Sequence, residues 1–343
     1  MLAWLPFADE AELLRRIGPL PTGVEWEPVS KERLGERIAE VQFLVLPYLS
    51  GTRALQRVGE MTSLEVVQTQ TAGYEDVVPH VPEQATLCNG AGIHDTSTAE
   101  IALALALANG RHLDEFARNQ TTGTWQPQWG TSLADQRVLI IGYGRIGQAI
   151  EERLLPFEVA SVTKVASRAR DDIHGVDELA ELLPNTDVAI LVAPYSASTH
   201  HLLDAGKLAL LPDGALVVNV GRGKLIDTDA LVAETSAGRL RAALDVTDPE
   251  PLPADHPLWT CPGVTISPHV GGASSAFHRR TAALIRDQLH RWAAGESLAN
   301  VVKQAERGSG ESGLDTSDAS AGLLDQRRSS SERSERVETT EGR

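Results

Sequence analysis

The chain has 343 residues, 42% of them hydrophobic, and a formal net charge of −16. This length exceeds what one compact core usually holds, so two domains are expected. The acidic balance offers no basic face for a phosphate backbone and argues against nucleic acid or an anionic membrane as a partner. No stretch fits a membrane span or a signal peptide. Cys88 and Cys261 provide neither a disulfide framework nor metal-ligand spacing, which favours a reducing cytoplasm.

The first hundred residues alternate between strand-like and helix-like segments. Gln42–Leu46 and Glu65–Thr69 predict short buried strands, and Ser50–Val58 predicts a helix between them. The loop Gln70–Tyr74 follows the second strand and is a candidate anion cradle, although an ordinary turn that needs glycine explains it equally well. Thr96–Arg111 is apolar nearly all round, which predicts a helix buried between the domains.

The segment Val138–Gly147 (VLIIGYGRIG) ends an apolar run on three glycines spaced G-x-G-x-x-G. Such a strand-to-helix turn is typical of dinucleotide sites. Gly142 would allow the tight turn, Gly144 would let the backbone approach a pyrophosphate, and Gly147 would let the helix pack closely on the sheet. Arg145 and Ile146 open the helix and complete the predicted cofactor turn. Glycine-rich turns also serve purely structural connections, so the pattern alone is weak.

The alternation continues to about residue 272 and predicts a second α/β unit of six strands, the size of a full dinucleotide fold. Leu284–Leu298 then predicts an amphipathic helix that returns to the first unit and makes the N-terminal domain discontinuous. Residues 304–343 contain few large apolar side chains and are expected to be disordered. The predicted strands after the glycine turn are 161–165, Asp187–Val192, Ala215–Asn219, Ala242–Asp245 and Val264–Ser267, and the predicted helical segments are 145–155, 176–183, 204–211 and Thr228–Ala237.

Three ionisable residues follow the later strands, where open parallel sheets place their chemistry: Arg222, Glu250 and His269. Reduction of a 2-oxo acid needs a guanidinium for the carboxylate and carbonyl, an imidazolium as proton donor, and a carboxylate that keeps the imidazole charged. Asp245 and Asp248 are rival acids that spacing does not exclude. The remaining histidines considered lack this placement and are interpreted as surface or packing residues: His94, His112, His174, His200, His201 and His256.

From about Gln42 to about Val302 the chain resembles the D-isomer-specific 2-hydroxyacid dehydrogenase family. The resemblance rests on VQTQTAGYEDV, CNGAGIHDTSTAE, GYGRIG, NVGRGKLIDTDAL, ALDVTDPEPLPADHPLW and SPHVGG, in the family's order and spacing. It implies that Arg222, Glu250 and His269 form the catalytic set and that the backbone of Ala72 and Gly73 binds the substrate carboxylate. It also implies a cofactor-binding role for Asp245, and a homodimer built mainly through the coenzyme domain.

The resemblance further implies two Rossmann-like, doubly wound parallel-sheet domains, one inserted in the other. The expected boundaries are 1–104 for the first part of a substrate domain, 105–275 for the NAD(P)-binding domain, and 276–303 for the helix that returns to the substrate domain. The tail 304–343 is left outside this fold.

The residues after the second strand of the coenzyme unit depart from the pattern of NAD-dependent Rossmann proteins, which place an acid there to bind the ribose hydroxyls. This chain has Ser167, Arg168 and Arg170, with no acid before Asp171. A hydroxyl and two guanidiniums suit a 2′-phosphate, so NADP(H) is the expected cofactor, with NAD(H) as the alternative. A solvated basic loop is the structural explanation that competes with this interpretation.

The expected reaction is hydride transfer between the nicotinamide and a small 2-oxo or D-2-hydroxy acid of the glyoxylate or hydroxypyruvate type. Tyr48, Leu49 and the loop near Tyr195 are candidates for the side-chain pocket. Glu250 stands where the related formate dehydrogenases have glutamine, which disfavours that activity. A phosphoglycerate dehydrogenase without a regulatory domain and a cofactor-sensing binding protein similar to transcriptional corepressors are the alternatives.

Overall fold

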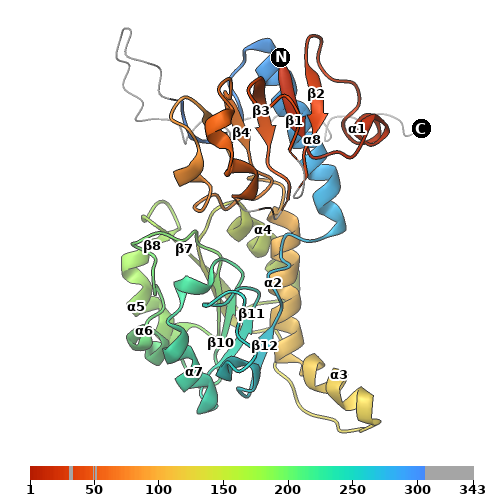
Figure 1. The fold of residues 1–343 in the computed structure, drawn as a ribbon. Coiled ribbons are helices and arrows are strands. Elements are labelled where there is room, and N and C mark those ends of the chain that lie inside the picture. The colour runs from red at the N-terminus through yellow and green to blue at the C-terminus, as the bar shows by residue number, and fades with distance from the viewer. Residues whose placement is uncertain (31–33, 49, 51, 306–343) are drawn as a thin grey trace, which may run out of the picture. The chain divides into compact units, whose positions relative to one another are not determined.

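Two sheets organise the unit Met1–Ala305 in the computed structural model, which describes residues 1–30, 34–48, 50 and 52–305 (Figure 1). Sheet A has the strand order β13-β5-β4-β3-β1-β2, and all its pairings are parallel except that of β13 with β5. The predicted tail lies outside the described residues from 306 onward. The strands of sheet A are β1 (Leu2–Leu5), β2 (Glu25–Pro28), β3 (Val41–Val45), β4 (Val66–Gln68), β5 (Thr86–Cys88) and β13 (Val301–Lys303).

Sheet B is wholly parallel, with the order β12-β11-β10-β9-β6-β7-β8. The chain runs outward from β6 in both directions, which opens a crevice at the carboxyl ends of β6 and β9. The strands are β6 (Arg137–Ile141), β7 (Ser161–Ala166), β8 (His174–Gly175), β9 (Val188–Leu191), β10 (Leu216–Asn219), β11 (Arg241–Leu244) and β12 (Val264–Ile266).

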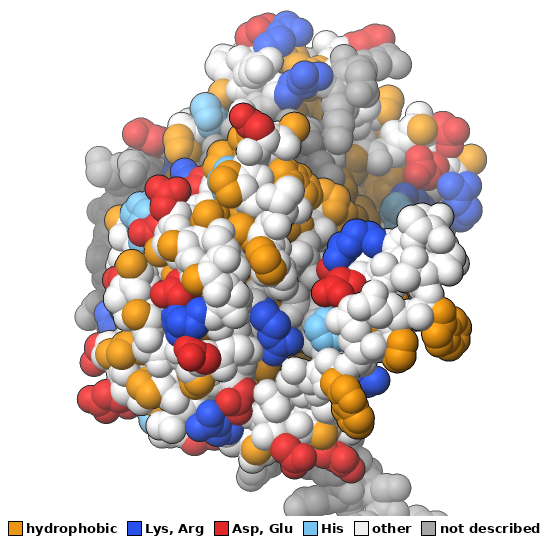
Figure 2. Space-filling view, turned by 90° about the horizontal axis from the view of Figure 1, so that it is seen from below, with side chains coloured by type: hydrophobic (Ala, Val, Ile, Leu, Met, Phe, Trp, Pro, Cys, Tyr) orange, Lys and Arg blue, Asp and Glu red, His pale blue; other side chains and the backbone are white. Residues whose placement is uncertain are grey.

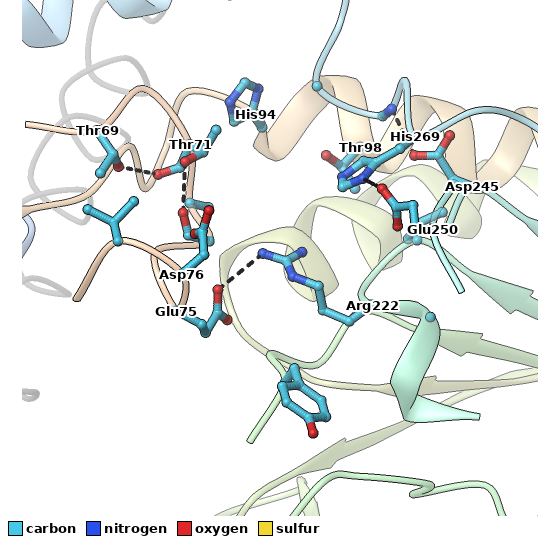
Figure 3. A pocket seen from close by; sticks show the side chains of 18 of the residues that line it. Thr69, Thr71, Glu75, Asp76, His94, Thr98, Arg222, Asp245, Glu250 and His269 are labelled. Atoms are coloured by element: carbon cyan, nitrogen blue, oxygen red, sulfur yellow. Dashed lines mark hydrogen bonds and ion pairs between the residues drawn. The ribbon is translucent and has the colours of Figure 1, made fainter. Parts of the chain in front are cut away.

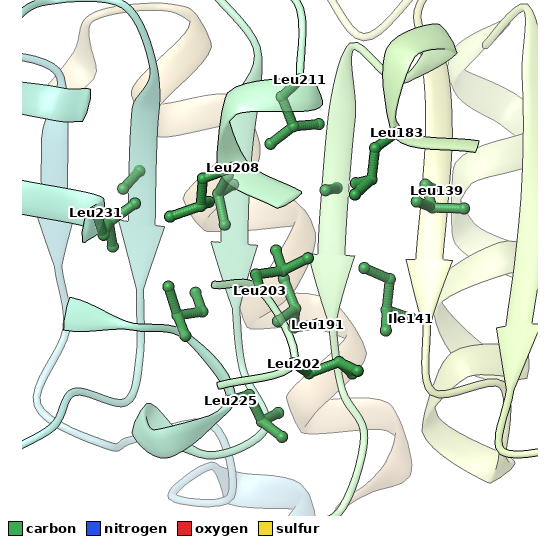
Figure 4. Packing of buried hydrophobic residues seen from close by; sticks show 14 of the residues in the cluster. Leu139, Ile141, Leu183, Leu191, Leu202, Leu203, Leu208, Leu211, Leu225 and Leu231 are labelled. Carbon is green, nitrogen blue, oxygen red and sulfur yellow. The ribbon is translucent and has the colours of Figure 1, made fainter. Parts of the chain in front are cut away.

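Helices cover both faces of sheet B, and its strands are therefore apolar on both sides. On one face, Leu139 and Leu191 pack with Leu203, Leu208 and other residues of the helices and connections (Figure 4). On the other face, alternate residues of the same strands pack against α2 (Asp95–Gly110) and α4 (Arg145–Leu154). The helices of the first face are α5 (Leu179–Leu182), α6 (Ala205–Leu210) and α7 (Thr228–Ser236).

The helix α8 (Ser275–Ala294) follows the loop after β12 and packs against α1 (Glu10–Ile17) on sheet A. Its buried Gln288 donates to the Gln68 side chain on β4 at 2.7 Å and to the Ala299 carbonyl at 2.9 Å. These contacts fix the chain that leads into β13. Sheet A is thereby built from both ends of the described sequence.

The predicted class of doubly wound α/β sheets is confirmed, and each of the six strands predicted after residue 137 is present. Sheet B has seven strands rather than six, because the two-residue edge strand β8 was not predicted. The helix predicted at 50–58 is wrong. The chain instead forms two 3-10 turns, Arg53–Leu55 and Val58–Glu60, because so short a segment between Gly51 and Gly59 in the sequence cannot nucleate an α-helix. The helix predicted from residue 284 begins nine residues earlier, at Ser275.

The buried helix predicted at 96–111 is α2, but it lies along sheet B rather than between two domains, with its first turn at the junction of the sheets. The expected domain boundary at residue 104 therefore falls inside a continuous helix. None of the described helices combines the length and the apolar content that crossing a bilayer requires.

Beyond α2 the chain forms a projecting segment at residues 111–131, which carries α3 (Leu113–Thr122) away from sheet B (Figure 1). Hydrophobic side chains stand out on this segment at the right of the view in Figure 2. Trp125 is 95% exposed and Trp129 is 99% exposed. Such exposure of two large aromatic side chains is unusual on a monomer surface.

Candidate active site

The loop after β4 presents free backbone donors. The Thr69 hydroxyl donates to the Thr71 carbonyl at 2.8 Å, and the Thr71 hydroxyl donates to the Gly73 carbonyl at 2.7 Å. The Asn89 amide donates to the Ala72 carbonyl at 2.8 Å. Within the described part of the chain, the N–H groups of Ala72 and Gly73 donate to no acceptor. This combination of tied carbonyls and free N–H groups suits an anion.

Arg222 follows β10 and reaches across to that loop (Figure 3). Its Nη1 donates to the Gly221 carbonyl at 2.7 Å, and its Nη2 lies 3.5 Å from Oε2 of Glu75. A Cβ at Gly73 would lie 1.7 Å from Nη2 of Arg222, so the guanidinium packs directly against the Gly73 backbone and a side chain there would have to displace it. Arg222 therefore faces both the free N–H groups and an acidic side chain.

The loop after β12 is organised by Asp245, which is 2% exposed at the end of β11. Its Oδ1 accepts from the Ser267 hydroxyl at 2.5 Å and from the Val270 N–H at 2.9 Å. Its Oδ2 accepts from the Gly271 N–H at 2.8 Å, and its backbone carbonyl accepts from the His269 N–H at 2.8 Å. Asp245 thus sets the position of His269 without touching its ring.

Glu250 is the acid that contacts the His269 ring, with Oε1 at 2.5 Å from Nδ1 (Figure 3). This hydrogen bond raises the pKa of His269 above its ordinary value, against the opposing effect of partial burial. Because Nδ1 is engaged by Glu250, Nε2 is the nitrogen left for a ligand. Of the two rival acids, Asp245 is committed to its loop, and the Asp248 side chain makes no hydrogen bond in the part of the chain described.

Arg222, Glu250, His269, Ala72 and Gly73 line one cavity of about 750 Å³, which lies between the carboxyl ends of the two sheets. Asp245 and Ile146 line it too. Tyr48 and Tyr195 also reach the cavity as predicted, whereas Leu49 lies outside the described residues. Four further ionisable residues line the cavity that were not predicted to belong to the site: Glu75, Asp76, His94 and Lys224.

His94 was predicted to be a surface or packing residue, and it proves to be both buried and part of the cavity wall. It is 7% exposed, and its ring stacks on Phe277 of α8 with a centroid separation of 5.6 Å. Its Nε2 pairs with the Gln70 carbonyl at 2.9 Å, while Nδ1 has no hydrogen-bond partner in the described residues. Burial lowers the pKa of His94 and favours the neutral ring. The sequence signals for this role were its position just before α2 and its place in the segment CNGAGIHDTSTAE.

The sequence matches a known protein family and several of its members. The D-isomer specific 2-hydroxyacid dehydrogenase, NAD binding domain family matches residues 103–271. The glyoxylate reductase of Pyrococcus horikoshii is 30% identical over 293 residues, covering 80% of this chain and 87% of that protein. The chain belongs to the D-isomer-specific 2-hydroxyacid dehydrogenase family.

Two further relatives agree. The glyoxylate/hydroxypyruvate reductase B of Citrobacter koseri is 31% identical over 244 residues, covering 67% of this chain and 75% of that protein. The crystal structure of the NADPH-dependent glyoxylate/hydroxypyruvate reductase of Sinorhizobium meliloti, in complex with NADP and malonate, is 25% identical with a TM-score of 0.73, covering 90% of this chain and 99% of that one. The predicted assignment to an NAD(P)-dependent oxidoreductase of 2-hydroxy acids is confirmed.

The glycine turn of the dehydrogenase fits a dinucleotide. Gly142 has φ +110°, and a Cβ there would lie 2.4 Å from the Ala193 nitrogen, so the tight turn excludes a side chain. No atom lies within 4 Å of where a Cβ of Gly144 would stand, just before α4. A Cβ at Gly147 would lie 2.7 Å from the Gly142 carbonyl. The open backbone at the start of α4 is where a pyrophosphate would lie. Arg145, the first residue of α4, pairs with Asp95 at 2.8 Å.

The basic loop after β7 adjoins this turn. The N–H groups of Gly142 and Tyr143 both donate to the Val165 carbonyl, at 2.9 and 2.8 Å, and Arg170 donates to the Tyr143 carbonyl at 3.2 Å. Ser167 and Arg168 are exposed, and within the described residues Arg168 forms no ion pair. A hydroxyl and an unpaired guanidinium therefore stand at the edge of the dinucleotide crevice.

The contact between Glu250 and His269 yields a pH prediction. Glu250→Gln keeps the shape of the side chain but removes the charge that favours a protonated His269, so the pKa of His269 should fall. The protonated ring would then be lost at lower pH. We expect the alkaline limb of the pH profile for 2-oxo acid reduction to move to lower pH.

Asp248→Asn is the matched control, because it removes a nearby carboxylate without touching the ring. Its profile should keep the wild-type limb. If the alkaline limb moved in Asp248→Asn but not in Glu250→Gln, Asp248 and not Glu250 would be the acid that keeps His269 protonated.

Proposed function

We propose that the dehydrogenase reduces a small 2-oxo acid of the glyoxylate or hydroxypyruvate type, with NADP(H) as its preferred cofactor. The observation that carries the proposal is the meeting of Arg222, the Glu250–His269 pair and the free N–H groups of Ala72 and Gly73 in one cavity. The names of the Pyrococcus, Citrobacter and Sinorhizobium relatives support the substrate class.

In this proposal the substrate carboxylate accepts hydrogen bonds from Ala72, Gly73 and Arg222, and Arg222 also polarises the carbonyl. The bound nicotinamide supplies the hydride. His269 donates the proton from Nε2 to the developing alkoxide, while Glu250 holds Nδ1 and stabilises the imidazolium. Asp245 fixes the loop from which His269 projects. We also propose that Asp245 contributes to cofactor binding, as the family resemblance implies.

Glu75 competes with the substrate for Arg222. Its Oε2 accepts from the Tyr74 N–H at 2.9 Å and lies 3.5 Å from the guanidinium. A substrate carboxylate must take the place of this carboxylate at Arg222. A second carboxylate on the substrate would meet Glu75 and Asp76, so the cavity favours monocarboxylic 2-oxo acids.

The role of Arg222 is tested by Arg222→Lys, which keeps the charge but loses the planar fork. We expect kcat/KM for glyoxylate and hydroxypyruvate to fall more than about tenfold. The measurement is the loss of nicotinamide absorbance across a panel of 2-oxo acids with NADPH and NADH. Near-normal kinetics would remove Arg222 from the site, and no turnover of any 2-oxo acid by the wild type would contradict the proposed activity.

The cofactor preference rests on Ser167 and Arg168 at the dinucleotide crevice. Arg168→Ala should weaken NADPH binding by about 1–3 kcal/mol, because a charged hydrogen bond to the 2′-phosphate is lost, and should leave NADH nearly unchanged. Dissociation constants from fluorescence titration check this. Equal losses for the two cofactors would make Arg168 part of a solvated loop.

We also propose a homodimer, with the segment 111–131 as part of the interface and with sheet B contributing the rest. The exposure of Trp125 and Trp129 supports this, because burying two indoles against a second copy removes a large apolar area from water.

Sheet A with α1 and α8 is proposed as the substrate domain, and residues from α2 to β12 as the coenzyme domain. The unpaired Cys88 and Cys261 support a cytoplasmic location.

A dimer interface at residues 111–131 predicts that substitutions there lower the molar mass of the protein in solution. Trp125→Arg with Trp129→Arg should shift the dehydrogenase from dimer to monomer in light scattering after size exclusion. Trp259→Arg is the control, since Trp259 is also exposed but lies elsewhere. A wild-type monomer would contradict the proposed dimer, and a double variant that stays dimeric would place the interface elsewhere.

A further inference from the structure

A groove of about 560 Å³ lies between α1 and α8, on sheet A and away from the catalytic cavity. Five basic residues line it: Arg15 and Arg16 from the last turn of α1, and His278, Arg279 and Arg286 from α8. Ala282 and Ala283 are its other lining residues. Every ionisable side chain in the wall is therefore basic.

Three of the four guanidiniums in the wall lie outside any ion pair with the described residues. Arg16 pairs with Glu12 at 3.2 Å, but Arg15, Arg279 and Arg286 form no ion pair with any residue in the described ranges. Further along the same helix, Arg291 is neutralised by Asp287 at 2.7 Å. The whole chain carries −16, and the residues before 304 carry −13. Unpaired guanidiniums gathered at one point of so acidic a protein are not explained by its general composition.

Hydrogen bonds within the groove hold some of its side chains in place. Arg16 Nη2 lies 3.1 Å from Nδ1 of His278 and donates to the His278 carbonyl at 3.5 Å, which ties the two helices together. Because a guanidinium only donates, Nδ1 accepts and the ring carries its proton on Nε2. The α1 macrodipole explains a preference for Arg15 and Arg16 at a helix C-terminus, but it does not explain Arg279 and Arg286.

We propose that this groove is a second anion site, which binds a phosphate or pyrophosphate group. Guanidiniums match the paired oxygens of phosphate with parallel hydrogen bonds, and the three unpaired ones, those of Arg15, Arg279 and Arg286, suit an anion with more than one charge. Arg279 and Arg286 are seven residues apart, so they lie on one face of α8 with room for the anion over the two alanines between them. The bound group bridges α8 to the end of α1.

The test is calorimetric titration of the dehydrogenase with inorganic pyrophosphate, with saturating NADPH present to fill the cofactor site. The wild type should show saturable binding that weakens as salt is raised from 50 to 200 mM, as ion pairing requires. Arg279→Gln combined with Arg286→Gln should weaken binding at least tenfold.

Arg291→Gln is the matched control, because it removes an arginine from the same helix outside the groove. It should bind pyrophosphate within twofold of the wild type. Arg15→Gln repeats the test from the other helix if the double variant fails to fold. Absence of saturable binding by the wild type, or equal binding by the groove variants and Arg291→Gln, would overturn the proposal.

Discussion

The candidate active site depends on one buried carboxylate, that of Asp245. Removing a carboxylate from water is costly unless each oxygen is hydrogen-bonded, and here both oxygens accept from the loop after β12. The loop in turn carries His269 and, three residues further, Gly272 beside Tyr48 and His94. The position of His269, and with it the reach of Glu250, follows from hydrogen bonds made by a residue that never touches its ring.

The same loop connects the two sheets. Four residues after Gly271, α8 begins, and its N-cap Ser274 lies 2.5 Å from the Ser97 hydroxyl on α2. Phe277 on α8 then contacts both His94 and Tyr48, with ring centroids 5.6 and 4.2 Å apart. The cavity wall is therefore assembled from the start of α2, the start of α8 and the loops of sheet A. A change in the angle between the two sheets would have to alter these contacts.

The sequence predicted sheet B well because its signals are local. β6 and its glycine turn form one continuous pattern, and Arg222, Glu250 and His269 each follow a strand whose end defines the cavity. β1 gave no such signal, since its four buried residues become a strand only by pairing with β2 and β3. The antiparallel β13 depends in the same way on a partner more than 200 residues away.

Glu75 and His94 were missed for a related reason. Each lies within a few residues of a predicted element. The contacts that place them in the cavity are made with residues from distant parts of the chain. Glu75 meets a guanidinium because Arg222 comes from sheet B, and the His94 ring is stacked because Phe277 comes from α8. Patterns in a single sequence indicate where strands end and which face of a helix is buried. They do not indicate which residues of two different sheets come into contact.

The helix α8 supports a wall of the main cavity and also lines the basic groove. Phe277 faces the catalytic cavity through His94, and the adjacent His278 faces the basic groove. Neighbouring residues on a helix point about 100° apart, so one turn of α8 contributes to both walls. A ligand that drew α1 and α8 together would act on the turn that supports His94. Such coupling requires the helix to differ in position between bound and free states, because a ligand shifts only an equilibrium whose states it binds unequally.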